Sequence, residues 1–183
     1  KLSSSHVSFG IAPLLNAVGR LAHAETAVDL LTHLEGDLAT AAAGELAGLN
    51  RKRQGVQRAI VEEALSEIET LDEHRIVILL NDDWKRGVVG VAAGKCIEKH
   101  YRPTILLSGE GDELVGSARS IKGFSIFDAL CACQEHLVQF GGHDMAAGLT
   151  LARKNYESFL CAMQAYADKH ITDQQLLPTI TPD

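Results

Sequence analysis

The chain has 183 residues, of which 46% are hydrophobic, enough for one domain of ordinary size or for one compact domain with an extended element. No apolar run approaches the roughly 18 residues that a membrane helix needs, and the N-terminal stretch KLSSSHVSFG lacks the charged-then-apolar order of a secretory signal. We therefore expect a cytoplasmic protein with no membrane partner. The net charge of -7 disfavours nucleic acid as a partner, since phosphates are bound through many cations.

Charge is unevenly distributed along the chain. Carboxylates concentrate in residues 61–74 and in the stretch GEGDE at 109–113. The basic side chains with few acids nearby in sequence are Arg20, Arg51, Lys52, Arg53, Arg58, Lys85, Arg86, Arg119 and Lys122. Two interpretations stay open from the residues alone: a local basic groove on an acidic protein, or a set of solvated charged faces.

The cysteines and the chain ends bear on the context of the protein. Cys96, Cys131, Cys133 and Cys161 follow no disulfide spacing, and we expect them to be reduced, as in a cytoplasmic protein. The chain starts at Lys1 rather than at a methionine and ends in the proline-punctuated stretch LLPTITPD. These ends predict a segment of a larger protein that finishes in a linker.

From residue 24 to about residue 71 the sequence pattern is helical. A short amphipathic segment at 24–33 is followed, after Gly36 and Asp37, by apolar residues at helical steps from Leu46 to Ile68. A helix of about 34 residues would be about 50 Å long, more than a domain of this size needs across its core. We therefore expect one long helix over residues 36–71 that connects two bodies.

After Asp72 the pattern changes to alternating strands and helices. The predicted strands lie at 75–80, 103–108, 114–121 and 146–152, and the predicted helices at 87–101, 125–137 and 155–170. Only a glycine-rich turn separates the second and third strands, which makes the sheet mixed rather than parallel. The predicted fold class is α/β: a long connecting helix followed by a mixed-sheet α/β domain with helices on both faces.

The stretch NDDWKRGVVG at 81–90 is a first candidate for anion binding. It follows a strand and opens a helix, so the free backbone N–H groups near Gly87 lie beside Lys85 and Arg86. An ordinary helix cap has the same ingredients, and both interpretations stay open.

The stretch GSARSI at 116–121 is a second candidate. Alternation along a strand places Ser117 and Arg119 on one face, where a hydroxyl and a guanidinium could address the same phosphate. An arginine in a structural ion pair is the alternative.

The stretch FGGHDMAAG at 140–148 is the third candidate. Gly141 and Gly142 let a ligand approach the backbone, and His143 can donate a hydrogen bond or, as imidazolium, offset negative charge. These residues predict a phosphate cradle, with a purely structural histidine as the alternative. A zinc site built from His143, His136, Cys131 and Cys133 is disfavoured, because the two cysteines diverge on a helix at about 100° per residue.

Taken together, these stretches resemble a known family. FGIAPLLNAVGRL, LNRKRQ, WKRGVVGVAAGK, RPTILL, GSARSI and FGGHDMAAGL occur in the order seen in the RecJ-type single-strand-specific exonucleases of the DHH phosphoesterase superfamily. The resemblance covers nearly the whole chain. It implies that residues 1–35 end the first (DHH) domain, 36–71 are the connecting helix, 72–170 form the DHH-associated substrate-binding domain, and 171–183 are a linker toward a C-terminal domain.

The resemblance also implies an activity: 5′-to-3′ digestion of single-stranded DNA in repair and recombination. In the family, aspartates and histidines of the first domain hold two manganese or magnesium ions. No Asp-His-His triplet occurs here, so we expect no metal or other cofactor in this segment and no activity from the segment alone. The expected partners are single-stranded DNA, the missing N-terminal catalytic domain and a C-terminal domain.

The site residues that the resemblance implies fall in two groups. Asn16 and Arg20 would face the cleft between the domains. The phosphate contacts would be Ser117, Arg119, Ser120, Gly141, Gly142 and His143, with His143 next to the metals as the catalytic candidate. We expect Trp84 to pack in the core rather than to stack on a base.

Two alternatives to the exonuclease remain. One is part of a phosphodiesterase of the same superfamily that degrades oligonucleotides or cyclic dinucleotides. The other is a non-catalytic nucleic-acid-binding module. The long basic helix and the linker-like tail favour the exonuclease, because short substrates require neither.

Overall fold

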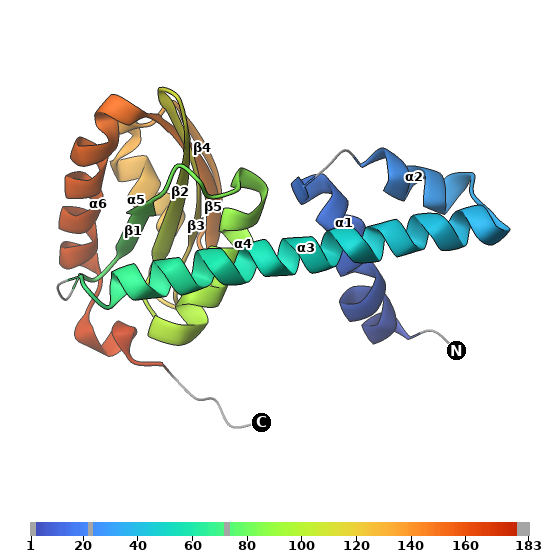
Figure 1. The fold of residues 1–183 in the computed structure, drawn as a ribbon. Coiled ribbons are helices and arrows are strands. Elements are labelled where there is room, and N and C mark those ends of the chain that lie inside the picture. Colours follow the sequence, from blue (N-terminus) through green and yellow to red (C-terminus); the bar gives the residue numbers. More distant parts are fainter. Residues whose placement is uncertain (1–2, 22–23, 72–73, 179–183) are drawn as a thin grey trace. The chain divides into compact units, whose positions relative to one another are not determined.

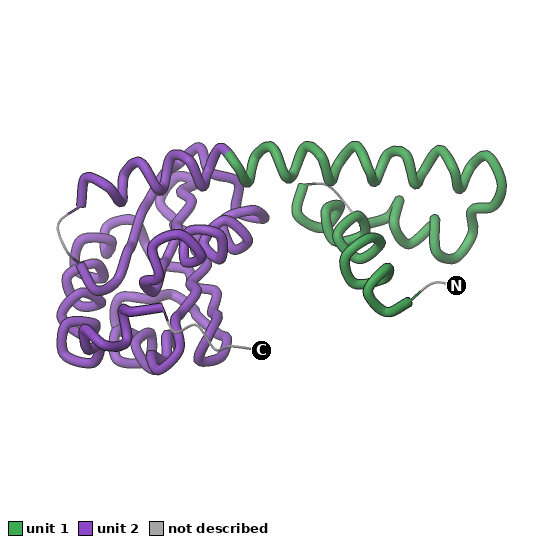
Figure 2. The backbone as a smooth tube through the Cα atoms, turned by 90° about the horizontal axis from the view of Figure 1, so that it is seen from below, with its two compact units in different colours: residues 1–58 green, residues 59–183 purple. Residues whose placement is uncertain are grey.

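The computed structural model describes residues 3–21, 24–71 and 74–178. The chain divides into two compact units, residues 1–58 and 59–183, and the division falls inside one long helix (Figure 2). Within the described residues, no helix combines the length and the apolarity needed to cross a membrane.

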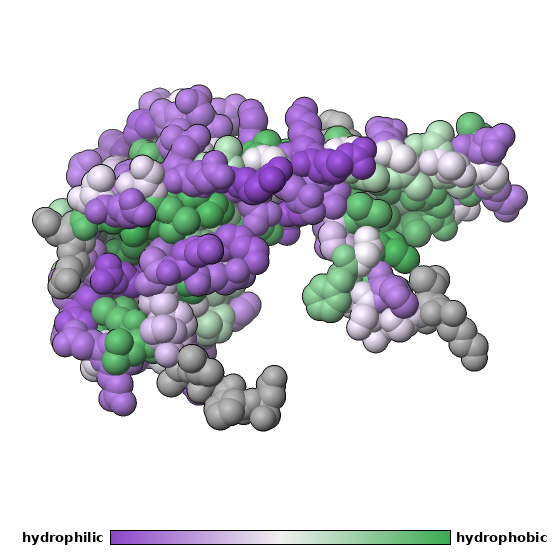
Figure 3. Space-filling model, turned by 60° about the horizontal axis from the view of Figure 1, so that its bottom comes forward, coloured by the Kyte–Doolittle hydropathy of each residue, from purple (hydrophilic) through white to green (hydrophobic). Residues whose placement is uncertain are grey.

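Unit 1 is helical. A π-helical turn at His6–Ile11 leads into α1 (Ala12–Leu21), followed by α2 (Glu25–Thr32) and the first part of α3 (Gly36–Ile68), as Figure 1 shows. Its core is small and consists of Val18, Ala27 and Leu46, with half-buried leucines around them. Phe9, Leu31 and Leu38 are 84%, 67% and 68% exposed, and hydrophobic surface gathers on these helices in Figure 3.

The predicted long helix is confirmed as α3, which ends at Ile68 rather than near residue 71. In the part that belongs to unit 2, Ile60 and Ala64 are buried. The indole Nε1 of Trp84 donates a hydrogen bond of 2.7 Å to the Glu63 carboxylate. Trp84 is only 4% exposed, so it packs in the core as predicted and joins the turn before α4 to α3.

Unit 2 contains a five-stranded sheet in the order β1-β2-β3-β5-β4. The strands are β1 (Val77–Leu80), β2 (Thr104–Glu110), β3 (Glu113–Arg119), β4 (Gln139–His143) and β5 (Ala146–Ala152). β1 and β2 are parallel, and the other neighbours are antiparallel. The predicted mixed sheet is therefore confirmed.

Helices cover both faces of this sheet, as predicted (Figure 1). α5 (Ile126–Ala132) and α6 (Tyr156–His170) enclose the main core on one face, where Leu130, Phe159 and Met163 pack with Leu149 and Leu151. α4 (Arg86–His100) lies on the other face and packs against β2 and β3. Successive residues of a strand point to opposite faces of the sheet. Because helices cover both faces, apolar residues on either face have apolar partners.

The sequence analysis missed β4. QFGGH carries two glycines and no alternation of apolar and polar residues, so nothing local favours a strand. The strand forms because its backbone pairs with β5 from Gln139↔Thr150 to His143↔Ala146, across a two-residue turn. The stretch expected to form a phosphate cradle is an exposed edge strand followed by a turn.

The segment predicted as a linker from residue 171 begins as packed structure. Ile171 is 3% exposed, Gln175 donates a 2.6 Å hydrogen bond to the Gly123 carbonyl, and Asp173 pairs with Arg75 at 2.6 Å. These contacts join residues 171–176 to unit 2, which corrects the predicted start of the linker. Residues 179–183 of that segment lie outside the described residues.

Candidate nucleic-acid interface

Three transverse rows of residues cross the open half of the sheet. Directly paired residues of neighbouring strands point to the same face, so the register defines each row. The Arg119 row is Arg119, Ala146 and His143; the Ser117 row is Ser117, Gly148 and Gly141; the Val115 row is Val115, Thr150 and Gln139. Arg119 and His143 therefore lie on one face, with two strand spacings, or about 10 Å, between their backbones.

Glycines leave the middle row open. A Cβ added to Gly141 would meet nothing within 4 Å, and one added to Gly148 would have only the Gly116 carbonyl oxygen at 4.0 Å. Both glycines are exposed. The Ser117 row, which neighbours the row of Arg119, Ala146 and His143, therefore has a bare backbone floor that a chain-like ligand can approach closely.

Helix α4 borders this floor along β3. A Cβ at Gly90 would come within 2.8 Å of the Ser117 hydroxyl and 3.2 Å of Nη2 of Arg119. A side chain at position 90 would therefore force Ser117 and Arg119 to shift, and glycine lets α4 lie beside both. The Arg119 guanidinium also donates from Nη1 to the Ala118 carbonyl at 2.8 Å, which helps to fix its orientation.

His143 is oriented by the turn that follows it. The backbone N–H of Met145 donates to Nδ1 of His143 at 3.3 Å. Because Nδ1 accepts this bond, the neutral ring carries its proton on Nε2. His143 is exposed, so Nε2–H can serve as a donor to a ligand on the face.

The β4–β5 turn is anchored to the rest of unit 2 on both sides. Ser125 donates from its hydroxyl to Asp144 Oδ1 at 3.0 Å, and the Ile126 N–H donates to the Asp144 carbonyl at 3.0 Å. The Ser120 N–H donates to the Met145 carbonyl, also at 3.0 Å. These bonds fix the end of β4 and with it the backbone that carries His143.

Two of the expected phosphate contacts lie elsewhere. The hydroxyl of Ser120 is buried and donates to the Phe124 carbonyl at 2.6 Å, because β3 ends at Arg119 and the chain turns away. Gly142 has a φ of 152° and points to the opposite face from His143, where a Cβ would collide with the carbonyl oxygen of Ala146. Ser120 and Gly142 therefore shape turns, and neither residue belongs to the Arg119, Ser117 or Val115 row.

Asn16 and Arg20 lie on α1 and belong to unit 1, whereas the β-sheet belongs to unit 2. Asn16 is exposed and Arg20 half-buried. Arg53 on α3 donates to Asn50 at 3.1 Å and to Gln57 at 2.8 Å. Burial and the nearby positive charge of Arg20 lower the pKa of Arg53, so unit 1 brings two guanidinium groups near each other.

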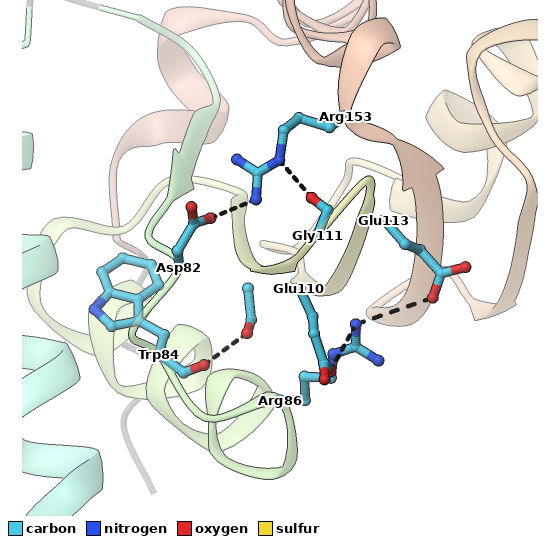
Figure 4. A network of polar contacts seen from close by, with 8 residues as sticks. Asp82, Trp84, Arg86, Glu110, Gly111, Glu113 and Arg153 are labelled. Carbon is cyan, nitrogen blue, oxygen red and sulfur yellow. Dashed lines mark hydrogen bonds and ion pairs between the residues drawn. The ribbon is translucent and has the colours of Figure 1, made fainter.

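The predicted anion site at the start of α4 is occupied by protein groups. Arg86 pairs with Glu110 at 3.4 Å and Glu113 at 4.0 Å, as Figure 4 shows. Arg153 joins the same region by contacting Asp82 and the Gly111 carbonyl, both at 2.8 Å. This network connects the β2–β3 turn to the loop before α4, and Arg86 acts in it as a structural cation.

Sequence reasoning did not identify Gly148, Gly90, Gln139 or Thr150 as parts of this face. Gly148 and Thr150 could have been found by extending the alternation of β5 from Ala146, once its pairing with β3 was known. Gly90 and Gln139 depend on contacts between distant segments, and no local signal marks them. Within the described residues, no three His, Cys, Asp or Glu side chains gather in a way that could hold a metal ion.

Comparison with known proteins places the chain in a family. The model of the DHHA1 domain family matches residues 72–169. The chain belongs to the DHHA1 domain family. The DHHA1 domain here contains all five strands, and with them the Arg119, Ser117 and Val115 rows.

The relatives of this DHHA1 protein include single-stranded-DNA-specific exonucleases. The chain is 38% identical to RecJ of Bacillus subtilis over 94% of its own length and 22% of the relative's. It is 36% identical to RecJ of Escherichia coli over 87% of its length and 29% of the relative's. The chain thus spans less than a third of these relatives, and the predicted resemblance to the RecJ type is confirmed.

Solved structures agree with this placement. RecJ of Thermus thermophilus in complex with Mg2+ matches with a TM-score of 0.81 and 32% identity, over 90% of this chain and 26% of that one. An exonuclease RecJ bound to manganese matches with a TM-score of 0.79 over 91% of this chain and 42% of that one. The described residues of this chain do not form a metal site by themselves.

Proposed function

We propose that this chain is part of a single-stranded-DNA-specific 5′-to-3′ exonuclease, and that its DHHA1 domain grips the phosphates of the strand. The names of the relatives support the substrate and the reaction class. The observation that carries the proposal is the pairing register, which puts Arg119 and His143 in one row on one face, next to the bare glycine floor of the Ser117 row.

Each residue of the face has a role in this proposal. Arg119 makes charge-assisted hydrogen bonds to phosphate oxygens, and Ser117 beside it donates a further one. His143 donates from Nε2 to a phosphate oxygen at the other end of the Arg119 row. Asn16 and Arg20 of unit 1 add contacts to the same strand, and manganese or magnesium is held by a part of the protein outside this chain.

The floor suits a single strand rather than a duplex. Gly148 and Gly141 permit a single strand to approach the backbone, and the contacts of Arg119, Ser117 and His143 with phosphates carry no base sequence. The face presents three donor groups, those of Arg119, Ser117 and His143, along a flat strand surface rather than on a helix that could enter a groove. The four cysteines, all free, support our further proposal of a cytoplasmic location.

The test uses the full-length protein that contains this chain. We expect binding of long single strands to be far tighter than binding of dinucleotides, and cleavage in manganese or magnesium from a labelled 5′ end. The double variant Arg119→Ala, His143→Ala should lose both properties, while Lys169→Ala on α6, at the opposite face of the sheet, should retain them.

Other outcomes would support the alternatives. Equal or better turnover of dinucleotides would identify a short-substrate phosphodiesterase. Strand binding without cleavage in either metal would identify a non-catalytic nucleic-acid-binding module.

A further inference from the structure

A shallow hollow lies on the sheet face next to the Ser117 row. It has a volume of about 400 Å³, and its lining includes Val115, Gln139, Gly141, Gly148 and Thr150. The hollow therefore lies over the Ser117 and Val115 rows. The Arg119 row comes next along the strands, on the other side of the Ser117 row. Successive rows are about 7 Å apart along the strands, so the hollow begins within one residue repeat of the phosphate-binding side chains.

The hollow exists because two paired positions lack side chains. Gly141 and Gly148 face each other across the β4–β5 pair, and their Cβ positions project into empty space. At Gly116, by contrast, a Cβ would meet the side chains of Leu107 and Leu149, so that glycine serves the core. The hollow is thus a property of the open face and not a packing defect.

The lining is neutral and amphipathic. Val115 supplies an apolar surface, and Gln139 is an exposed amide whose Nε2 lies 3.4 Å from the Thr150 hydroxyl. An amide can donate and accept hydrogen bonds at the same time, as the edge of a nucleobase does. The five residues named carry no charge, so this surface suits an uncharged planar group rather than another phosphate.

We propose that this hollow seats the base and sugar of the nucleotide whose phosphate contacts Arg119 and Ser117. The inference rests on the proposed function and adds a nucleoside subsite to it. Val115 contacts the flat face of the base or the sugar, and the Gln139 amide meets a polar edge. The backbone floor of Gly141 and Gly148 lets both fit without displacing a side chain.

The proposal is tested with oligonucleotides that carry one abasic site, moved along the strand position by position. The wild-type full-length protein should lose about tenfold in affinity when the abasic site falls on the nucleotide seated in the hollow, and little at neighbouring positions. Gly148→Val fills the hollow, and valine suits a strand at this position. In this variant the intact strand should bind about as weakly as the abasic one, and the positional penalty should vanish.

Two control variants separate the hollow from general damage to the fold. Gly148→Ala adds one methyl group and should keep most of the penalty. Gln139→Ala should reduce the abasic penalty. Val138→Ala removes an exposed side chain from the residue just before β4, outside the lining of the hollow, and should leave the penalty unchanged. Thermal unfolding of each variant should match the wild-type protein.

The outcomes also distinguish this subsite from the phosphate row. If Gly148→Val lowers affinity but retains the abasic penalty, or if the wild-type protein shows no positional penalty, the nucleoside subsite is refuted. If a free nucleoside 5′-monophosphate competes for binding as effectively as an oligonucleotide does, the hollow binds free nucleotides rather than a nucleotide of the strand, and the proposal is overturned. The proposed function itself fails by a separate result, an Arg119→Ala variant whose binding depends on salt as the wild type's does.

Discussion

Replacing Arg119 with alanine removes one guanidinium from the Arg119 row; the side chain is half-buried beside α4 and is not part of the hydrophobic core between the sheet, α5 and α6. Each phosphate contact with a single strand contributes about 0.7 to the slope of log affinity against log salt. If Arg119 holds one phosphate, the slope should become shallower by about 0.7. Between roughly 50 and 200 mM salt, that change corresponds to a difference of about 2.6-fold in the loss of affinity.

The assay is equilibrium binding of a fluorescent single strand to the full-length protein at several salt concentrations. Lys169→Ala is the matched control, since it removes one exposed positive charge from the last turn of α6. That helix packs on the other face of the sheet. The control should weaken binding little and leave the slope unchanged.

Two results would refute this reasoning. An unchanged slope in Arg119→Ala would show that the guanidinium contacts no phosphate. Equal changes in both variants would show that the protein acts through its overall charge rather than through the Arg119 row.

Three further predictions concern the framework of the face. Gly142→Ala should lower the free energy of unfolding by at least about 2 kcal/mol in chemical denaturation, because its backbone angle and the Ala146 carbonyl both oppose a side chain. Trp84→Phe should cost about 1 to 2 kcal/mol from the lost hydrogen bond to Glu63 alone, and Glu63→Gln should cost less. Burial, with a smaller effect of nearby positive charge, lowers the pKa of His100 from 6.5 to about 4. Its contribution to stability should therefore be present above pH 6.5 and be lost as the pH falls toward 4 in pH-dependent unfolding.

Each of these has a distinct contrary result. A Gly142→Ala protein of wild-type stability would mean that the β4–β5 turn adopts another backbone. Equal losses in the Trp84 and Glu63 variants would show that the acceptor's charge matters more than its hydrogen bond. A His100→Gln variant with the same pH dependence as the wild type would assign the acid sensitivity to other groups.

Local pattern was sufficient for most of the fold. The β-branched runs before residues 80 and 108 and the apolar run after residue 146 predicted strands, and the short turn after β2 predicted the mixed sheet. These signals are local because buried strands need continuous apolar residues. β4 gave no such signal, since its glycines disfavour an isolated strand and only pairing with β5 defines it.

Local sequence pattern also predicted part of the site. Alternation along β3 correctly placed Ser117 and Arg119 on one face, and the register brings His143 to that face as well. Ser120 could not be assigned from alternation, because the end of β3 depends on the turn that its own hydroxyl stabilises. Arg86 next to the start of α4 suggested an anion site, but its partners Glu110 and Glu113 come from a distant turn.

The central claim is that a single strand contacts Arg119 and His143 and lies over the neighbouring glycine floor of Gly148 and Gly141. A crystal structure of the full-length protein with a 5′-phosphorylated single-stranded oligonucleotide tests it most directly. We predict a phosphate oxygen within hydrogen-bond distance of the Arg119 guanidinium, a second contact from His143 Nε2, and a strand lying over Gly148 and Gly141. A strand bound elsewhere, with Arg119 hydrogen-bonded only to protein groups and the floor open to solvent, would contradict the account.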